Sequence, residues 1–456
     1  MPAKNNHANA STRVAGPRLV AAEIVRDIFA DERLFSELLA EHRGFARLSP
    51  ADRRLAYHLA AGTIKYKRRL DFIARHFLAA KYDSLPKNIR AVLRLGLFQL
   101  SVSEKIPPYA AVSETVKLAR YLGHRGTASL VNAVLRRFSN EMREVTFPSP
   151  ETHFRDFLAE WFSYPDWLID LVLELGGEKD AEQFCLWGNR EPDFYLRLNP
   201  LKATEAQLLT AANAEGIKLA AMPLFPGYYQ WLGGGGPSLS SAILRDGLAS
   251  VQNPAAGLVV RLLNPRPKDK VTDLFTAPGG KATAIAERQH DQGYIFAVDK
   301  NSERLQKVVE NKGRLGLKSI LPITGDAAEL PEREVHCVLA DVPCSALGTL
   351  PKNPDVRWKK NPEDIVRLAH DQARYIEAAG RHVCREGTLV YATCTITPQE
   401  NREVVRGFLS RHPDFALESA AEFVFGEFVD ADGFLHTFPP RPGLDCVFAA
   451  RLRRKR

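Results

Sequence analysis

The chain has 456 residues, of which 45% are hydrophobic and 25% charged, a composition typical of a globular protein with two or three domains. It contains no apolar run of the ~18–20 residues that a membrane helix requires, and its first 18 residues lack the apolar core of a signal peptide. We therefore expect a cytoplasmic protein with no membrane partner, in which residues 1–18 form a disordered tail.

The spacing of the six cysteines argues against a metal site, because it contains no CxxC pair and no His-rich cluster. In the cytosol these thiols are expected to stay reduced. Cys185, Cys337, Cys384 and Cys446 are interpreted as small buried apolar residues, a common environment for a free cysteine. We therefore expect no metal cofactor.

Positive charge is concentrated in the first third of the chain. Residues 1–145 contain 25 Lys and Arg against 13 Asp and Glu, whereas the net charge of the whole chain is only +8. The remainder is therefore slightly acidic, a distribution that indicates a polyanion-binding module joined to a part with another role. A basic surface that is merely solvated is the alternative.

Residues 19–145 are predicted to form an all-helical bundle. Apolar residues recur there at three- and four-residue spacing, in segments separated by Gly, Pro and polar residues. In residues 88–100 the apolar side chains form one stripe, while Arg90 and Arg94 lie off it.

Residues 154–250 follow a linker with two prolines (146–153) and are predicted to form a small α+β unit. Helical periodicity over residues 155–186 precedes a strand near 194–200, and a glycine-rich loop covers 232–238.

Residues 251–456 alternate between short apolar runs and helical segments. This alternation predicts a parallel sheet with helices on both faces, in which ligands bind beyond the carboxyl ends of the strands. The predicted strands cover residues 270–275, 293–299, 319–326, 335–343 and 387–394. Glycines, carboxylates and thiols stand at the ends of these strands, so we expect them to converge on one cleft.

The stretch "DLFTAPGGKATAIAE" (273–287) is predicted to be a strand, a Pro-Gly-Gly turn and a helix. Its glycines would let a ligand approach the backbone, and the helix N-terminus would offer free N–H groups. Phe275 and Ala282 replace the Gly and Ser/Thr of a phosphate-binding P-loop, and the stretch is not GxGxxG. A strand–helix turn without a ligand is the alternative.

Two aspartates follow the next strands. Asp299 is placed to accept hydrogen bonds from ribose hydroxyls, and Asp326 could meet an adenine edge. Each alone could be a helix cap or a turn residue. Together they describe a nucleoside pocket that needs no phosphates, and S-adenosylmethionine fits it.

Cys344 and Cys394 follow two other predicted strands, and Asp341 lies three residues before the first. Cysteine attacks carbon as the thiolate, a minor form at neutral pH unless a cation such as Lys281 lies nearby. A thiolate that adds to C6 of a pyrimidine makes C5 nucleophilic enough to accept a methyl group. The sequence supplies a thiol, a carboxyl group for the base edge and a site for a methyl donor.

Five stretches resemble the successive motifs of RNA (cytosine-5) methyltransferases of the Sun/RsmB type, across residues 251–456: "DLFTAPGGK", "VDK", "GDA", "LADVPCSALGTLPKNPDVRW" and "YATCTITPQEN". The helical part is similar to the NusB RNA-binding domain, with "VNAVLRRF" near its end. The resemblance implies a Rossmann-like class I methyltransferase domain (251–456), preceded by an all-α NusB-like domain (19–145) and the small α+β unit (154–250).

The resemblance also implies roles. The cofactor S-adenosylmethionine would be held by Phe275, Thr276, Ala277, Pro278, Gly279, Gly280 and Lys281, with Asp299, Asp326 and Asp341. Asp341 would contact the N3/N4 edge of cytosine, Cys394 would attack C6, and Cys344 would assist elimination and product release. Phe275 and Thr276 stand where the family often has smaller residues, and Thr395 stands where Ser is common.

The implied substrate is small-subunit (16S) rRNA, unassembled or partly assembled, and the protein is expected to act as a monomer. Its target base must be presented unstacked. Candidate RNA contacts are the helical domain, the 154–250 unit, Lys352, Arg357, Trp358 and the C-terminal "RLRRKR". The alternatives are a cytosine-5 methyltransferase for tRNA or another RNA, a DNA enzyme that uses a Pro-Cys thiol, and a non-catalytic RNA-binding assembly factor.

Overall fold

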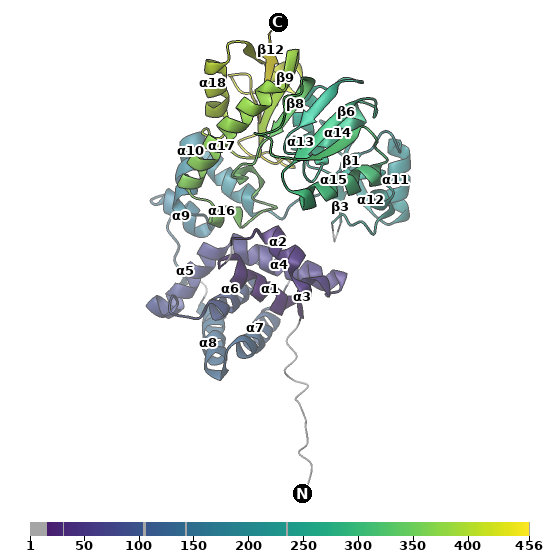
Figure 1. Cartoon of the computed structure of the whole chain (residues 1–456). Helices are drawn as coiled ribbons and strands as arrows, with labels where there is room; N and C mark the ends of the chain where they lie inside the picture. The colour runs from purple at the N-terminus through teal and green to yellow at the C-terminus, as the bar shows by residue number, and fades with distance from the viewer. Residues whose placement is uncertain (1–15, 31, 104–105, 142–143, 234–235, 456) are drawn as a thin grey trace. The chain divides into compact units, whose positions relative to one another are not determined.

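The computed structural model describes residues 16–30, 32–103, 106–141, 144–233 and 236–455, which form two compact units (Figure 1). The first contains the described residues up to Asn189 together with Asn353–Lys359, and the second contains the rest. Helix α1 begins at Gly16, so residues 16–18 are helical, whereas residues 1–15 of the predicted tail lie outside the described residues. No helix in the described part of the chain is long and apolar enough to cross a membrane.

The first unit is helical: its described residues up to Glu141 confirm the predicted bundle, and it also includes two helices between Phe154 and Asn189, a stretch predicted to belong to the α+β unit (154–250). Its helices are α1 (Gly16–Ile28), α2 (Phe35–Glu41), α3 (Arg43–Ala46), α4 (Pro50–Lys65), α5 (Lys67–Leu78), η2 (Ala79–Lys81), α6 (Lys87–Ser101), α7 (Pro108–Leu122), α8 (Arg125–Glu141), α9 (Phe154–Trp161), α10 (Asp166–Asn189) and α16 (Val356–Lys359). Helix α6 is almost wholly buried and packs against α1, α4, α7 and α8. Its apolar residues, such as Leu93 and Leu97, join one core.

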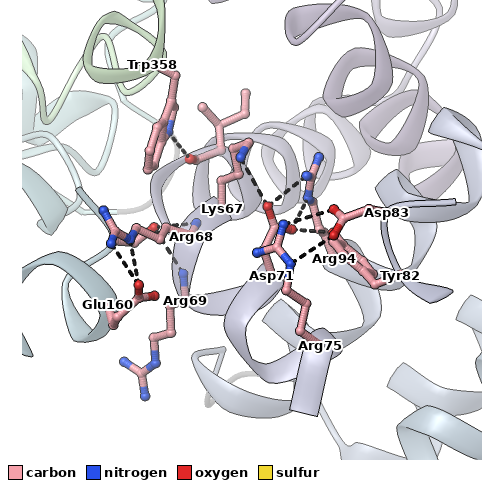
Figure 2. A network of polar contacts seen from close by, with 12 residues as sticks. Lys67, Arg68, Arg69, Asp71, Arg75, Tyr82, Asp83, Arg94, Glu160 and Trp358 are labelled. Atoms are coloured by element: carbon pink, nitrogen blue, oxygen red, sulfur yellow. Dashed lines mark hydrogen bonds and ion pairs between the residues drawn. The ribbon is translucent and has the colours of Figure 1, made fainter. Parts of the chain in front are cut away.

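A buried ion-pair network neutralises part of the positive charge of this unit (Figure 2). Arg94 binds Asp71 through Nε at 2.6 Å and Nη2 at 2.9 Å, and Lys67 Nζ lies 3.1 Å from the same carboxyl group. Burial raises the pKa of Asp71, but the charges and hydrogen bonds of Arg94 and Lys67 outweigh it and lower the pKa. Arg94 lies off the apolar stripe of α6, yet it is buried, and its ion pair with Asp71 belongs to the interior of the helical unit.

Residues Asn353–Lys359, which follow the Cys344 loop in sequence, are packed inside the helical unit. Arg357 is fully buried; its guanidinium donates to Asn189 Oδ1 at 2.8 Å and to the Gly188 carbonyl at 2.9 Å. Trp358 donates its indole N–H to the carbonyl of Ile64 at 2.8 Å (Figure 2). Arg357, one of the candidate RNA contacts, is therefore not available to RNA in this structure, because its side chain is fully buried and both Nη atoms donate within the protein.

The second unit begins with a four-stranded antiparallel sheet, in the order β2-β3-β1-β4. Its strands are β1 (Tyr195–Leu198), β2 (Lys218–Ala221), β3 (Tyr228–Leu232) and β4 (Ala249–Val251), and its helices are α11 (Glu205–Ala214) and α12 (Ala242–Arg245). The strand predicted near 194–200 is β1. Of the predicted 232–238 loop, residues 234–235 lie outside the described residues.

The large sheet has the order β10-β12-β9-β8-β5-β6-β7, and β11 pairs with β12. Its strands are β5 (Lys270–Asp273), β6 (Tyr294–Asp299), β7 (Ile320–Thr324), β8 (Val335–Asp341), β9 (Val383–Thr393), β10 (Phe415–Glu418), β11 (Leu435–His436) and β12 (Phe448–Arg454). Strands β5 to β9 are parallel, which confirms the five predicted strands, whereas β10 to β12 pair antiparallel and were not predicted.

Helices cover both faces of this sheet, as predicted (Figure 1). On one face, Leu339 of β8 shares a core with α13 (Pro254–Leu263), α14 (Gly280–Arg288) and α15 (Ser302–Leu315). On the other face, Val338 packs with α17 (Pro362–Arg381) and α18 (Arg402–Arg411). Because alternate residues of β8 enter different cores, the strand reads as a continuous apolar run.

Candidate active site

The carboxyl ends of four neighbouring parallel strands bring the predicted site residues to one edge of the large sheet. Strand β5 ends at Asp273, β6 at Asp299 and β8 at Asp341, and Cys394 directly follows β9. The order β9-β8-β5-β6 makes these ends adjacent. Strand β7, which precedes Asp326, lies next to β6, so all five predicted strand ends lie side by side; that they line one cleft stays a prediction.

The Pro-Gly-Gly turn connects β5 to α14 and is held from the β6 side. The N–H of Ala277 donates to Asp299 Oδ2 at 3.3 Å, and the carbonyls of Ala277 and Pro278 accept from side chains of α15. Gly279 has φ +97°, and a Cβ there would lie 3.2 Å from Val308. Glycine is therefore favoured for both conformation and space, and the turn leads directly into the N-terminus of α14.

A buried arginine from the small sheet supports the same turn. Arg197 of β1 pairs with Glu287 of α14 at 2.8 and 2.9 Å and donates to the carbonyl of Gly280 at 3.0 Å. Both side chains are buried. Sequence reasoning missed this pair, because the two residues are 90 positions apart and Glu287, at the end of the 273–287 stretch, had no assigned role.

Asp299 and Asp326 differ in their surroundings. Asp299 is buried, and its Oδ1 also accepts from the N–H of Asn301 at 3.0 Å, so the carboxylate is fixed at the end of β6. Asp326 is exposed on the loop after β7, and its Oδ1 accepts from the N–H of Ala328 at 2.9 Å. The contact with Ala328 corresponds to the alternative in which Asp326 is a turn residue.

Asp273 is a buried carboxyl group for which sequence reasoning gave no role. The side chain is 1% exposed; the Thr276 hydroxyl and the Phe275 backbone lie close enough to lower its pKa, but neither makes a hydrogen bond of normal geometry with its oxygens. Burial, with a further contribution from the charge of Asp341, raises the pKa of Asp273 to about 7. A buried carboxyl group that lacks a well-formed hydrogen bond, beside the N-terminus of α14, fits a ligand with a cationic group.

Lys281 and Asp341 form an ion pair, with 2.5 Å between Nζ and Oδ2. Burial lowers the pKa of Lys281, but the charge and hydrogen bond of Asp341 outweigh it, and the net pKa is raised. Lys281 therefore carries a positive charge at neutral pH. The charge of a Cys394 thiolate also contributes to this shift, so Lys281 is the cation that sequence reasoning placed near the thiols.

The two predicted thiols are in direct contact. The Sγ atoms of Cys344 and Cys394 are 3.2 Å apart, and the backbone N–H of Cys394 points to Cys344 Sγ at 3.3 Å. The hydrogen bond with Cys394, followed by burial and by the charges of Cys394 and Glu400, raises the pKa of Cys344 well above its usual range. Cys344 therefore stays a thiol at neutral pH and can donate to its neighbour.

The remaining cysteines lie outside this pair. Cys185, Cys337 and Cys446 are buried, as predicted, whereas Cys384 is half-buried. Within the described ranges, no group of three or more His, Cys, Asp or Glu side chains could hold a metal ion.

Comparison with known proteins places this site in a family. The model of the 16S rRNA methyltransferase RsmB/F matches residues 260–453, the NusB family model matches 16–140, and a ferredoxin-like domain of the RsmF/B type matches 164–227. "Probable ribosomal RNA small subunit methyltransferase B" of Synechocystis sp. is 36% identical over 81% of this chain and 84% of its own. The protein of the same name from Bacillus subtilis is 34% identical over 90% of this chain and 92% of its own.

The chain belongs to the RsmB/F methyltransferase family. The suspected resemblance is thus confirmed, and so is the fold: an all-helical NusB domain, a ferredoxin-like unit and a Rossmann-like methyltransferase domain. The crystal structure of PH0851 shares the fold with a TM-score of 0.78, at 24% identity over 96% of this chain and 99% of its own. The crystal structure of NSun6 from Pyrococcus horikoshii with SFG has a TM-score of 0.58, at 23% identity; the match covers 64% of this chain and 99% of that one.

As a member of the RsmB/F family, the protein uses S-adenosylmethionine as its methyl donor. The residues at the sheet edge fit this cofactor. The backbone of the Pro-Gly-Gly turn at the N-terminus of α14, the fixed carboxylate of Asp299 and the carboxyl group of Asp273 match a nucleoside that carries a cationic amino-acid group.

Asp273→Asn is expected to weaken S-adenosylmethionine binding about tenfold, since it removes one buried charge that faces a cation. The same variant should raise stability at high pH. Because the pKa of Asp273 lies above its ordinary value of 3.8, the folded state holds a proton that the unfolded state releases between pH 4 and about 7. The associated stability is complete below pH ~4 and is lost as the pH rises through ~7.

Melting curves at pH 5 and pH 8, together with calorimetric titration of the cofactor, measure both effects. At pH 8 the variant should melt several degrees above the wild type, and at pH 5, where only the first part of the linked stability has been lost, the difference should be clearly smaller. An equal effect at both pH values would contradict the assignment of the raised pKa to Asp273.

Proposed function

We propose that the protein transfers a methyl group from S-adenosylmethionine to C5 of a cytosine in 16S rRNA, through a covalent bond between Cys394 and C6. The observation that carries this proposal is the 3.2 Å contact between the Sγ atoms of Cys344 and Cys394, beside the Lys281–Asp341 ion pair. A methyltransferase whose target atom is already nucleophilic has no need of covalent attack by a thiol, and therefore no need of a second thiol to assist it.

The protonated state of Cys344 supports Cys394 as the attacking group. A thiol that keeps its proton can donate to a neighbouring thiolate and stabilise it, and the charge of Lys281 acts in the same direction. Attack by Cys394 on C6 moves an electron pair toward C5. After methylation, loss of the C5 proton and cleavage of the Cys394–C6 bond release the product, and Cys344 is the residue that assists this step.

The other residues hold the two substrates. Phe275 to Lys281, Asp273, Asp299 and Asp326 would hold the cofactor, which supplies an electrophilic methyl group when bound. Lys281 occupies Oδ2 of Asp341, so Oδ1 is the oxygen that would meet the N3/N4 edge of the base. The choice of 16S rRNA follows the names of the family and of its relatives. We further propose that the protein is a cytoplasmic monomer that needs no metal.

Cys344→Ala is expected to accumulate a covalent RNA–protein adduct, because attack proceeds while release is impaired. Cys394→Ala should form no adduct and should lose methyl transfer by about 10³-fold or more, as removal of a nucleophile does. Both are measured with tritiated S-adenosylmethionine, separate pools of 16S rRNA and tRNA, and denaturing gels. Cys384→Ala, at a half-buried cysteine outside the pair, is the matched control. Adducts in Cys394→Ala but not in Cys344→Ala would reverse the roles, and label only in tRNA would refute the rRNA substrate.

A basic groove between α7 and α8 is the surface of the helical unit that we propose for RNA. Its volume is about 660 Å³, and it is lined by Arg120, Arg136 and Lys117, the last of which pairs with Glu114 at 2.8 Å. Tyr109, 79% exposed, stands at the same groove. Cations for the phosphates and an exposed aromatic ring for base stacking are the features of a site for single-stranded RNA.

Tyr109→Ala is expected to weaken binding of single-stranded rRNA fragments roughly tenfold, because one stacked base is worth ~1–3 kcal/mol. Arg120→Ala should weaken binding and lower the salt slope by about one, since it removes one phosphate contact. Fluorescence anisotropy at several salt concentrations measures both quantities. The control is Arg125→Ala, an exposed arginine of α8 outside the groove. Equal losses in Arg120→Ala and Arg125→Ala would indicate diffuse attraction and refute a specific groove.

A further inference from the structure

Glu400 is a fully buried carboxyl group that the proposed chemistry does not use. It lies in the "PQEN" stretch that follows Cys394, and no salt bridge joins it to a Lys, Arg or His of the described residues. A buried carboxyl group without a cation is costly unless hydrogen bonds satisfy it. Its hydrogen bonds therefore show what it stabilises.

Five hydrogen bonds converge on this carboxyl group. Oε1 accepts from the Ser345 N–H at 2.8 Å and from Gln372 Nε2 at 3.0 Å. Oε2 accepts from the hydroxyls of Ser345 at 2.5 Å, Thr397 at 2.7 Å and Thr395 at 3.3 Å. Ser345 directly follows Cys344, and Thr395 directly follows Cys394. One carboxyl group thus binds the neighbours of both thiols.

The surrounding contacts close the arrangement on both sides. Gln372 of α17 also donates to the carbonyl of Pro343, which precedes Cys344, at 3.0 Å. The hydroxyls of Ser345 and Thr395 are 2.6 Å apart. Asn401, next to Glu400, exchanges hydrogen bonds with Thr393 and Thr395 on either side of Cys394, at 2.5 and 3.1 Å. The loops that carry the two thiols are therefore fixed to each other through Glu400 and its neighbour.

We propose that Glu400 is a positioning residue that holds Cys344 and Cys394 in contact, so that one thiol can assist the chemistry of the other. The hydrogen bonds described for its carboxyl group go neither to residues 275–281 nor to the sulfur atoms, and it acts through Ser345 and Thr395. The charged and titratable groups around the thiols are Glu400 and Tyr391 on the side of Cys344, and Lys281 on the side of Cys394. The importance of the contact for catalysis rests on the proposed function; the positioning itself does not.

Two substitutions test whether the hydrogen bonds of the Glu400 side chain hold the loops: one keeps a side chain of the same shape, and the other removes it. In Glu400→Gln the amide oxygen can replace Oε1 and accept from the two N–H donors, while the NH₂ group donates to hydroxyl oxygens that can turn to accept. The loops should therefore keep their positions. In Glu400→Ala all five acceptor contacts are lost, and the loops should separate.

The positioning is tested without RNA by dibromobimane, which becomes strongly fluorescent when two neighbouring thiolates each displace one bromide. Peptide mapping identifies the Cys344–Cys394 bridge. Glu400→Ala should bridge at least about tenfold more slowly than the wild type, since small displacements of reacting groups cost up to ~10²-fold. Glu400→Gln and the control Glu403→Ala, at an exposed carboxylate of α18, should stay within about threefold. Bridging by Glu400→Ala at the wild-type rate would overturn the proposal.

Melting curves and S-adenosylmethionine binding show whether the variants are folded. If Glu400→Ala does not fold, Ser345→Ala serves instead: it leaves Glu400 in place but removes two hydroxyl contacts, and should slow bridging about threefold or more. Unchanged bridging in Ser345→Ala would then overturn the proposal. In methyl transfer, Glu400→Ala should lower kcat by about 10²-fold with little change in the KM for RNA. If the wild type methylated no RNA, the proposed function would fail, whereas the bridging result would still decide the role of Glu400.

Discussion

The contact between Cys344 and Cys394 is the constraint on which the rest of the catalytic unit depends. It requires two loops, 50 residues apart in sequence, to leave the same edge of the sheet side by side. The parallel pairing of β8 and β9 provides this, with Asp341 opposite Ala392 at the end of the ladder. Because the register of a buried sheet is strongly specified, the relative position of the thiols follows from the core on both faces.

Electrostatics then gives the two thiols different properties. Lys281 keeps its charge because Asp341 offsets the cost of its burial, and it lies near Cys394. Cys344 is buried, hydrogen-bonded to the other thiol and close to Glu400, so its pKa is raised and it keeps its proton. Cys344 is thereby kept in the protonated form that a residue assisting its neighbour needs. The same low dielectric raises the pKa of Asp273.

Much of the fold and the thiol pair could be predicted from the sequence, because they depend on local signals. Alternating apolar runs identified strands β5 to β9, and the residues that follow them identified the site. Strand β12 was missed since its run "FAARLRR" mixes apolar and charged residues, although Arg451 is buried against the carbonyls of Leu262 and Leu263.

Long-range polar contacts were the features that sequence could not supply. The Arg197–Glu287 pair, the anchoring of Arg357 and the contacts of Glu400 to Ser345 join residues 55 to 169 positions apart. A charged residue in a single sequence is equally compatible with solvent, RNA and a buried partner. Arg357 therefore resembled an RNA contact until its carbonyl partners were known.

The central claim is that Cys394 attacks the base while Cys344 does not. Incubating the wild-type protein and S-adenosylmethionine with 16S rRNA that contains 5-fluorocytidine tests it directly, because fluorine at C5 cannot leave as a proton does and the adduct persists. Mass spectrometry of the digested adduct then identifies the modified residue. The account predicts a nucleotide on Cys394. A nucleotide on Cys344, or no adduct despite transfer of methyl groups to unmodified rRNA, would contradict it.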